Sequence, residues 1–176
     1  MITDIKSNDN YYNLSGKIYW PLFDCEVSVR IGQGKDVSIE YAEQCVSQLL
    51  KLDNAELQSL MRASISYFQD EEKCHREPIE MLFEFEGMPY PEGFEQPEQI
   101  LPYIKPVEIY IDQEIPDCYS VSIFSECAWE PEHGLQWVVR NGKALFVGAA
   151  QGLGSHGEEI LYLEIWKDTN YLIPNF

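Results

Sequence analysis

Basic residues are scarce in this sequence. The 176 residues include 12 Lys and Arg against 30 Asp and Glu, which gives a formal net charge of −18. Proteins that bind nucleic acid neutralise its phosphates with Lys and Arg, so we expect no direct binding of DNA or RNA. Anionic lipid headgroups are repelled for the same reason. The charge favours a basic protein partner, although solubility alone also explains it.

Closely paired cysteines and long apolar runs are lacking as well. The five cysteines (Cys25, Cys45, Cys74, Cys118 and Cys127) are odd in number and form no Cys-x-x-Cys motif. This pattern is typical of free thiols in a reducing compartment. No signal-peptide core is visible at the N-terminus, and no run approaches the roughly 20 apolar residues of a membrane span. We therefore expect a cytoplasmic protein that does not enter a membrane.

The chain has enough apolar material for one folded domain. Its apolar fraction is 45%, with 11 Tyr, 8 Phe and 4 Trp, which excludes a disordered acidic tail. A chain of this length fits a single domain, predicted here to span residues 1–176.

The first half of the chain predicts two strands and then two helices. Strands are expected over residues 17–20 and 25–31, the second because apolar and polar residues alternate there. Apolar spacing becomes helical from Ser38 to Leu52. Asp53 to Glu56 predicts a capping box at the start of a second helix, which ends near Lys73. The short joint between the helices predicts an antiparallel helical hairpin.

The second half predicts a proline-rich connection and then more strands. The connection runs from Pro78 to Pro106 and contains one short helix over residues 98–103. Asn141-Gly142 between two apolar runs is a strong hairpin signal, because both residues must adopt positive φ. The predicted fold is α+β, with the helical hairpin packed on an antiparallel sheet. The strands expected here cover residues 107–111, 119–124, 135–140, 143–147 and 160–166.

Cofactor motifs are incomplete. The run from Gly152 to Gly157 matches G-x-G-x-x-G, but it lacks the helix, the second parallel strand and the later acidic residue of a dinucleotide site. Cys74-His75, Cys127, His133 and His156 lack the short paired spacing of structural zinc ligands. We predict no bound metal, nucleotide or other cofactor.

Acidic residues are concentrated near the end of the second helix and in the proline-rich connection. They are either a solvated face or a docking surface for a basic partner. The candidate partner-binding residues are Asp70, Glu71, Glu72, Glu84, Glu86, Glu92 and Glu95. Aromatic residues between these acids are candidate anchors, although some must belong to the core: Phe83, Phe85, Tyr90 and Phe94.

The run from Cys127 to Leu135 is the most specific segment. We expect Trp129 to anchor the core, and Glu132 and His133 to stabilise a rigid connection between two strands by hydrogen bonds to its backbone. The alternative is chemical: Cys127 and His133 as the nucleophile and base of a small cytosolic hydrolase.

This block resembles that of a bacterial domain family of unknown function. The residues that carry the resemblance are Cys127, Trp129 and Glu132-His133-Gly134-Leu135, followed by Gly142 and Gly148. The order of strands and helices in the N-terminal half is similar too. The family is similar in genomic role to the immunity proteins of polymorphic toxin systems, including contact-dependent growth inhibition.

The resemblance implies an immunity protein rather than an enzyme, with no catalytic residues to carry over. Its partner is expected to be a cognate toxin domain, a basic nuclease such as an RNase or tRNase, since the cleft of a nuclease must bind phosphates. The connection from Pro78 to Pro106 resembles an insertion relative to the shorter members, which makes it a candidate for toxin-specific contacts. A regulatory binding module for another basic protein is the second alternative.

Overall fold

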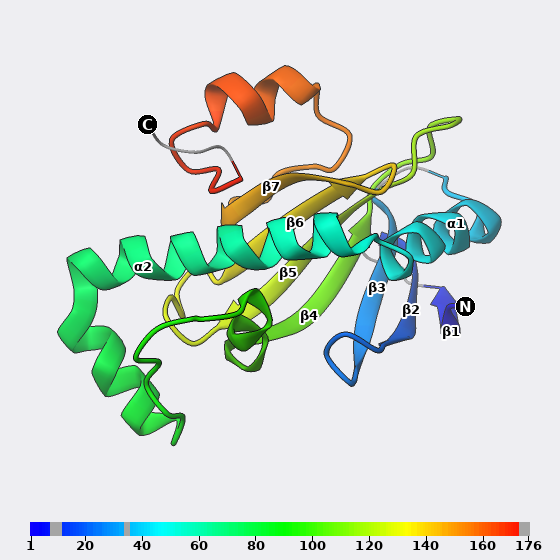
Figure 1. Cartoon of the computed structure of the whole chain (residues 1–176). Coiled ribbons are helices and arrows are strands. Elements are labelled where there is room, and N and C mark those ends of the chain that lie inside the picture. Colours follow the sequence, from blue (N-terminus) through cyan, green and yellow to red (C-terminus); the bar gives the residue numbers. More distant parts are fainter. Residues whose placement is uncertain (8–11, 34–35, 173–176) are drawn as a thin grey trace.

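The protein is built on one seven-stranded sheet whose strands lie in sequence order (Figure 1). The computed structural model describes residues 1–7, 12–33 and 36–172. Neighbouring strands are antiparallel, except that β3 and β4 are parallel. The strands are β1 (Thr3–Ser7), β2 (Tyr12–Trp20), β3 (Cys25–Gln33), β4 (Ile104–Ile111), β5 (Ser120–Cys127), β6 (Leu135–Arg140) and β7 (Lys143–Ala149).

The parallel pair explains where the helices lie in the chain. Parallel strands need a long crossover, and here it contains α1 (Ile39–Leu50), α2 (Asn54–Phe85) and the 3-10 helix η1 (Pro97–Tyr103). The α+β prediction is therefore confirmed, and its antiparallel sheet is corrected to a mostly antiparallel one. The strand β1 was not predicted from the sequence.

The structure does not show the antiparallel helical hairpin that the short joint predicted. Helix α1 contacts β5, whereas α2 contacts β7 and η1. In Figure 1 the two helices follow one another along the sheet instead of lying side by side. Each helix buries its apolar face against a different part of the sheet, so the two helices do not have to pack against each other.

Helix α2 continues past the point where the sequence predicted its end. The backbone leaves the helical region at His75, with φ of −134°, and then resumes as a helix to Phe85. Pro78 lies in the first turn of this second part, where a proline needs no N–H partner. The predicted connection from Pro78 to Pro106 is therefore wrong in its first part.

The start of α2 is fixed by Asp53 and by the hairpin of the sheet. Asp53 accepts a hydrogen bond from the backbone N–H of Glu56 at 2.9 Å, as predicted for the cap. The Glu56 carboxylate does not reach back to Asp53 and instead accepts the backbone N–H of Ala144 in β7, also at 2.9 Å. This bond joins α2 to the sheet.

The β6–β7 hairpin forms as the sequence predicted. Asn141 and Gly142 have φ of 49° and 75°, which are the positive values that such a two-residue turn requires. Its strands pair from Leu135 with Ala149 to Arg140 with Lys143.

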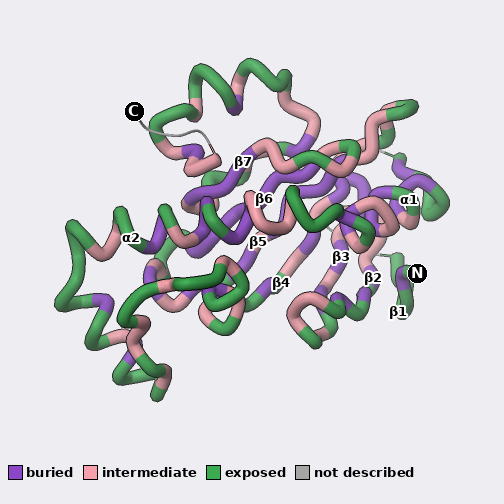
Figure 2. The backbone as a smooth tube through the Cα atoms, in the orientation of Figure 1, coloured by how far each residue is buried: buried purple, intermediate pink, exposed green. Residues whose placement is uncertain are grey.

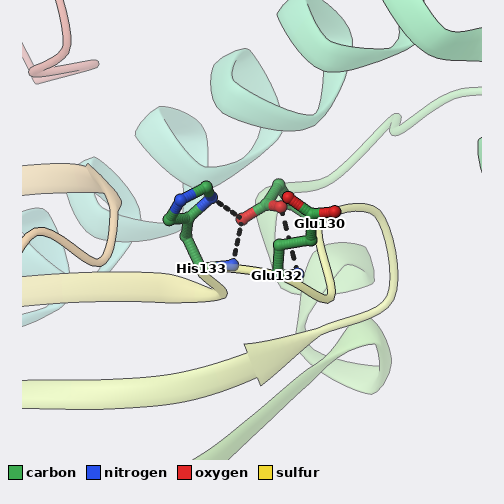
Figure 3. Close-up of side chains that lie close together, drawn as sticks. All are labelled: Glu130, Glu132 and His133. Atoms are coloured by element: carbon green, nitrogen blue, oxygen red, sulfur yellow. Dashed lines mark hydrogen bonds and ion pairs between the residues drawn. The ribbon is translucent and has the colours of Figure 1, made fainter.

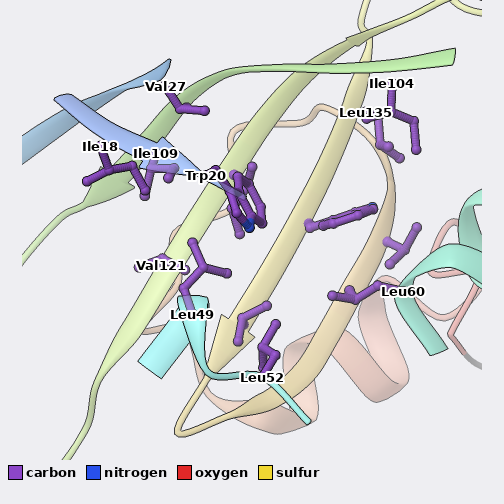
Figure 4. Close-up of a cluster of buried hydrophobic side chains, with 14 of the residues drawn as sticks. Ile18, Trp20, Val27, Leu49, Leu52, Leu60, Ile104, Ile109, Val121 and Leu135 are labelled. Atoms are coloured by element: carbon purple, nitrogen blue, oxygen red, sulfur yellow. The ribbon is translucent and has the colours of Figure 1, made fainter. Parts of the chain in front are cut away.

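The two faces of the sheet are buried by different parts of the chain. Trp137 lies in the main core between the sheet and the helices, and its indole N–H donates to the Ser64 hydroxyl at 3.0 Å. Its neighbour Val138 points to the other face and packs with Phe146 and Tyr162. Figure 2 shows the buried strands at the centre of the molecule. Figure 4 shows side chains of the main core, with Ile18 and Trp20 from the sheet and Leu49 and Leu60 from the helices.

The C-terminal segment covers the second face and contains no strand at the predicted position. Residues 160–166 instead include a short π-helix, η2 (Leu161–Ile165). Tyr162 and Trp166 are four residues apart, so one helical face packs against the sheet. The glycine-rich run before it follows the edge strand β7, and Arg140 donates to the Gly157 carbonyl at 2.6 Å. In the described part of the chain β7 is an edge strand that pairs antiparallel with β6, and no parallel strand follows the loop, so it is not the βαβ unit of a dinucleotide site.

Candidate functional site

The acidic arm, defined here as residues 70–98, extends away from the sheet (Figure 1). It contains ten acidic and two basic residues. Both basic residues form ion pairs within the arm: Lys73 with Asp70 at 3.6 Å, and Arg76 with Glu80 at 2.8 Å. Its remaining carboxylates are therefore a concentrated negative charge.

The seven predicted partner-binding acids fall into two groups. Glu84, Glu86, Glu92 and Glu95 are exposed on the outer part of the arm. Near its base, Asp70 accepts the Tyr171 hydroxyl at 3.0 Å and Glu72 accepts the Tyr90 hydroxyl at 2.8 Å. Asp70 and Glu72 therefore also hold the arm's own structure, and Glu71 is partly buried beside them.

Two apolar side chains stand open among these acids. Phe85 is 85% exposed and Met81, one helical turn earlier, is 70% exposed. Of the other candidate anchors, Phe83 is buried, while Tyr90 and Phe94 pack their rings against Phe68. Sequence reasoning missed Met81, although its i, i+4 spacing from Phe85 was visible.

The Glu130 carboxylate organises the loop between β5 and β6, a role that sequence reasoning did not assign. It accepts the backbone N–H groups of Glu132 at 3.1 Å, His133 at 2.7 Å and Gly134 at 3.0 Å (Figure 3). Gly134 has φ of 71°, and a Cβ there would lie 2.4 Å from the Ser125 carbonyl oxygen. The loop therefore needs both the carboxylate and the glycine.

Of the three residues predicted to be structural (Trp129, Glu132 and His133), the structure buries only the first. Trp129 is buried, with 2% of its surface exposed. Glu132 is exposed, and the His133 side chain is 62% exposed, with its Nδ1 3.3 Å from a Glu130 carboxylate oxygen. The side chain that accepts hydrogen bonds from the loop backbone is Glu130, so this residue takes the role predicted for Glu132 and His133.

This loop also brings three potential metal-ligand side chains together. One ligand atom each from Glu130, Glu132 and His133 lies within 4.8 Å of the others. The Glu130 carboxylate, however, already accepts three backbone N–H groups, which occupy most of its acceptor positions. The Glu130 carboxylate therefore stabilises the loop backbone and has little capacity left to coordinate a metal ion.

The hydrolase alternative has little support from the geometry. The Cys127 thiol is buried and lies 3.5 Å from the Glu130 carbonyl oxygen, to which it donates. Burial raises the pKa of the Cys127 thiol far above its usual range, which opposes the thiolate that attacks a substrate. The His133 Nδ1 lies 3.3 Å from a Glu130 carboxylate oxygen, to which the His133 backbone N–H also donates, so the residue is engaged with Glu130.

The base of the arm lies beside this loop. Burial raises the pKa of the Glu71 carboxyl above its usual range, and the nearby negative charge of Glu130 raises it further, while His75 and His133 oppose the change. An open groove of about 620 Å³ lies between the arm, β4, β5 and the loop. Two segments that are distant in the sequence thus form one surface.

We expect the loop to depend on Glu130 more than on His133. Glu130→Ala removes the acceptor of the Glu132 and His133 backbone N–H groups, while the Gly134 N–H keeps its bond to the Glu130 carbonyl oxygen at 3.0 Å. This variant should lower the free energy of unfolding by about 1–3 kcal/mol. His133→Ala removes an exposed side chain whose Nδ1 lies 3.3 Å from the Glu130 carboxylate, and it should cost at most about 1 kcal/mol. Urea unfolding of both variants measures the difference. A larger loss for His133→Ala contradicts this assignment.

The fold and site define an α+β protein with a mixed sheet and an acidic helical arm. The chain belongs to the family described as Domain of unknown function (DUF6985), whose model matches residues 1–154. Comparison with curated proteins and with solved structures finds no match. Within the described part of the chain, no helix has both the length and the apolar character needed to cross a membrane.

Proposed function

We propose that the protein is an immunity protein that binds a basic toxin domain through its acidic arm and neutralises it. The observation that carries this proposal is the pair of open apolar side chains, Met81 and Phe85, on an acidic helix that extends from the sheet. Burying one such side chain is worth about 1.5–3 kcal/mol, so a partner that covers both gains considerable affinity.

The surroundings of the pair favour a basic partner. Glu77, Glu80 and Glu84 lie on the same short stretch of helix and are exposed. Apolar anchors surrounded by charged residues are the usual arrangement of a binding hot spot, because the rim excludes water while the anchors supply affinity. Carboxylates also accelerate encounter with a basic surface.

A nuclease toxin fits this chemistry. Its substrate cleft must be basic in order to bind phosphates, and an amphipathic helix is a common ligand for a groove. The arm blocks such a cleft by occupying it, and the protein acts in the cytoplasm of the cell that it protects. A regulatory module for another basic protein uses the same surface with a different partner.

The proposal is tested by co-expression with the protein encoded immediately upstream. An immunity protein copurifies with that protein as a stoichiometric complex and protects cells that express its toxin domain. Copurification without protection supports the regulatory module instead. Absence of both contradicts either form of the proposal.

Phe85→Ser is expected to weaken this complex about 30-fold or more, as loss of a central anchor does. The control is Ile165→Ser, which removes an apolar side chain that is 65% exposed in η2, outside the arm. Isothermal titration calorimetry with the purified toxin domain compares the two. Equal affinities exclude Phe85 as an anchor.

A further inference from the structure

The groove beside the arm has an unusual combination of lining residues. Its volume is about 620 Å³, and it is bordered by residues 82–88 of the arm, by β4 and β5, and by the loop before β6. Apolar side chains make up one part of the lining: Leu82, Met88, Val107 and Phe124. Val107 is 39% exposed, so part of this apolar surface is open to solvent.

Charged side chains make up the other part, and they are not balanced. Glu126 is neutralised by Lys105, whose Nζ lies 2.7 Å from the carboxylate. Glu86 and Glu132 also line the groove, both exposed, and neither forms an ion pair with any residue in the described ranges. Glu86 and Lys105 line the same groove. The pKa of the Lys105 ammonium is raised mainly by its hydrogen bond to Glu126, and the negative charge of Glu86 adds to this effect.

The apolar lining and the carboxylates of Glu86 and Glu132 together favour a ligand that has both an apolar chain and a positive charge. Carboxylates from the arm and from the loop attract a cation, and the apolar lining between them accepts an aliphatic chain. Arginine and lysine have this amphipathic form, with a long apolar stem and a charged head. The planar guanidinium of arginine also packs well against aromatic side chains, and Phe124 and Tyr103 are in the lining.

We propose that the groove binds an arginine side chain from an exposed loop of the toxin domain. Its stem lies along Met88 and Val107, and its guanidinium is held by Glu86 and Glu132. This inference rests on the proposed function for the identity of the donor, but the recognition of arginine follows from the groove itself. Met81 and Phe85 on the arm and the groove beside them then hold the partner at two adjacent points.

The groove is tested first without any toxin. The full chain is titrated with N-acetyl-arginine N-methylamide and followed by ¹H–¹⁵N NMR. Shifts are expected at the backbone amides of Gly134 and Val107, with weaker binding of the lysine analogue. The norleucine analogue, which has a stem but no charge, should bind at least fivefold more weakly than arginine. Equal binding of arginine and norleucine, or shifts confined to other regions, overturns the proposal.

The carboxylates are tested with the variant Glu86→Gln/Glu132→Gln. It should bind the arginine probe at least fivefold more weakly, whereas the control Glu158→Gln/Glu159→Gln, which changes two exposed acids of the C-terminal segment, should bind it normally. Unchanged binding by the first variant overturns the proposal.

The same variants separate this inference from the proposed function. Binding of the arginine probe with no binding of the upstream toxin leaves the groove assignment intact and contradicts the immunity proposal. Normal toxin binding by Glu86→Gln/Glu132→Gln, in a variant that no longer binds the probe, supports the immunity proposal and overturns the toxin arginine as the occupant of the groove. Loss of affinity for both ligands supports the groove as a second contact.

Discussion

Trp129→Ala is expected to lower the free energy of unfolding by about 3–5 kcal/mol, as the loss of a large buried aromatic side chain does. Trp129 is 2% exposed, and its ring packs edge-on against Tyr67 at 5.9 Å and Phe68 at 5.8 Å between ring centroids. Both partners belong to α2, so the indole joins the loop after β5 to the helix that continues into the arm. Urea unfolding followed by far-UV circular dichroism measures the loss.

Trp129→Phe is the matched control. It keeps an aromatic ring in the same contacts and removes the indole N–H, which has no hydrogen-bond partner among the described residues. A buried donor without an acceptor is itself unfavourable, so this variant should lose less than about 2 kcal/mol. A loss below about 1 kcal/mol for Trp129→Ala contradicts a core role for this residue.

Elements that depend on local chemistry were predictable from the sequence. The hairpin at Asn141-Gly142 needs two positive φ values that these residues adopt at little cost, and the structure has it. The cap at Asp53 likewise depends on a side chain and a backbone N–H three residues away. Neither needs information from distant parts of the chain.

Elements that depend on tertiary packing were not predictable in the same way. Pro78 indicated the end of a helix, yet a kink at His75 starts a new helical segment in which that proline fits the first turn. The apolar run at residues 160–166 suggested a strand, but Tyr162 and Trp166 pack onto a sheet face that was not known from the sequence to be open. The parallel pairing of β3 with β4 was not predictable either, because it joins two strands that are far apart in the sequence.

The candidate site shows the same division. The acids of the arm are visible in the sequence, but their exposure separates Glu84 and Glu86 from Asp70 and Glu72, which bond to tyrosines. The role of Glu130 depends on a turn that brings three backbone N–H groups to one carboxylate. A sequence motif shows which residues are present in such a turn, not which of them binds its backbone.

Charge reversal on the arm is expected to abolish protection against the toxin. In the variant Glu84→Lys/Glu86→Lys/Glu92→Lys each substitution adds two charges, so the net charge changes from −18 to −12. All three residues are exposed, so the fold should survive. Like charges facing a basic surface slow the encounter and cost several kcal/mol in a complex. We expect the association rate to fall at least tenfold at low salt, as measured by surface plasmon resonance.

The control for net charge is Glu158→Lys/Glu159→Lys/Glu164→Lys. These three exposed residues lie in the C-terminal segment, and their reversal changes the net charge by the same amount outside the arm. If the local field of the arm steers the partner, the control keeps most of the association rate and protects cells. If both variants lose binding equally, overall charge alone drives association and the arm has no special role.

Salt dependence separates steering from anchoring. The Debye length falls from about 30 Å at 0.01 M salt to about 8 Å at 0.15 M, so the association rate of the wild type should drop steeply over this range. The triple arm variant should show a flat or inverted dependence, since its local charge no longer attracts a basic surface. The dissociation rate should respond to Phe85→Ser instead, because buried contacts hold a complex once it has formed. A wild-type association rate that is indifferent to salt, together with full protection by the arm variant, excludes the acidic arm as the binding surface.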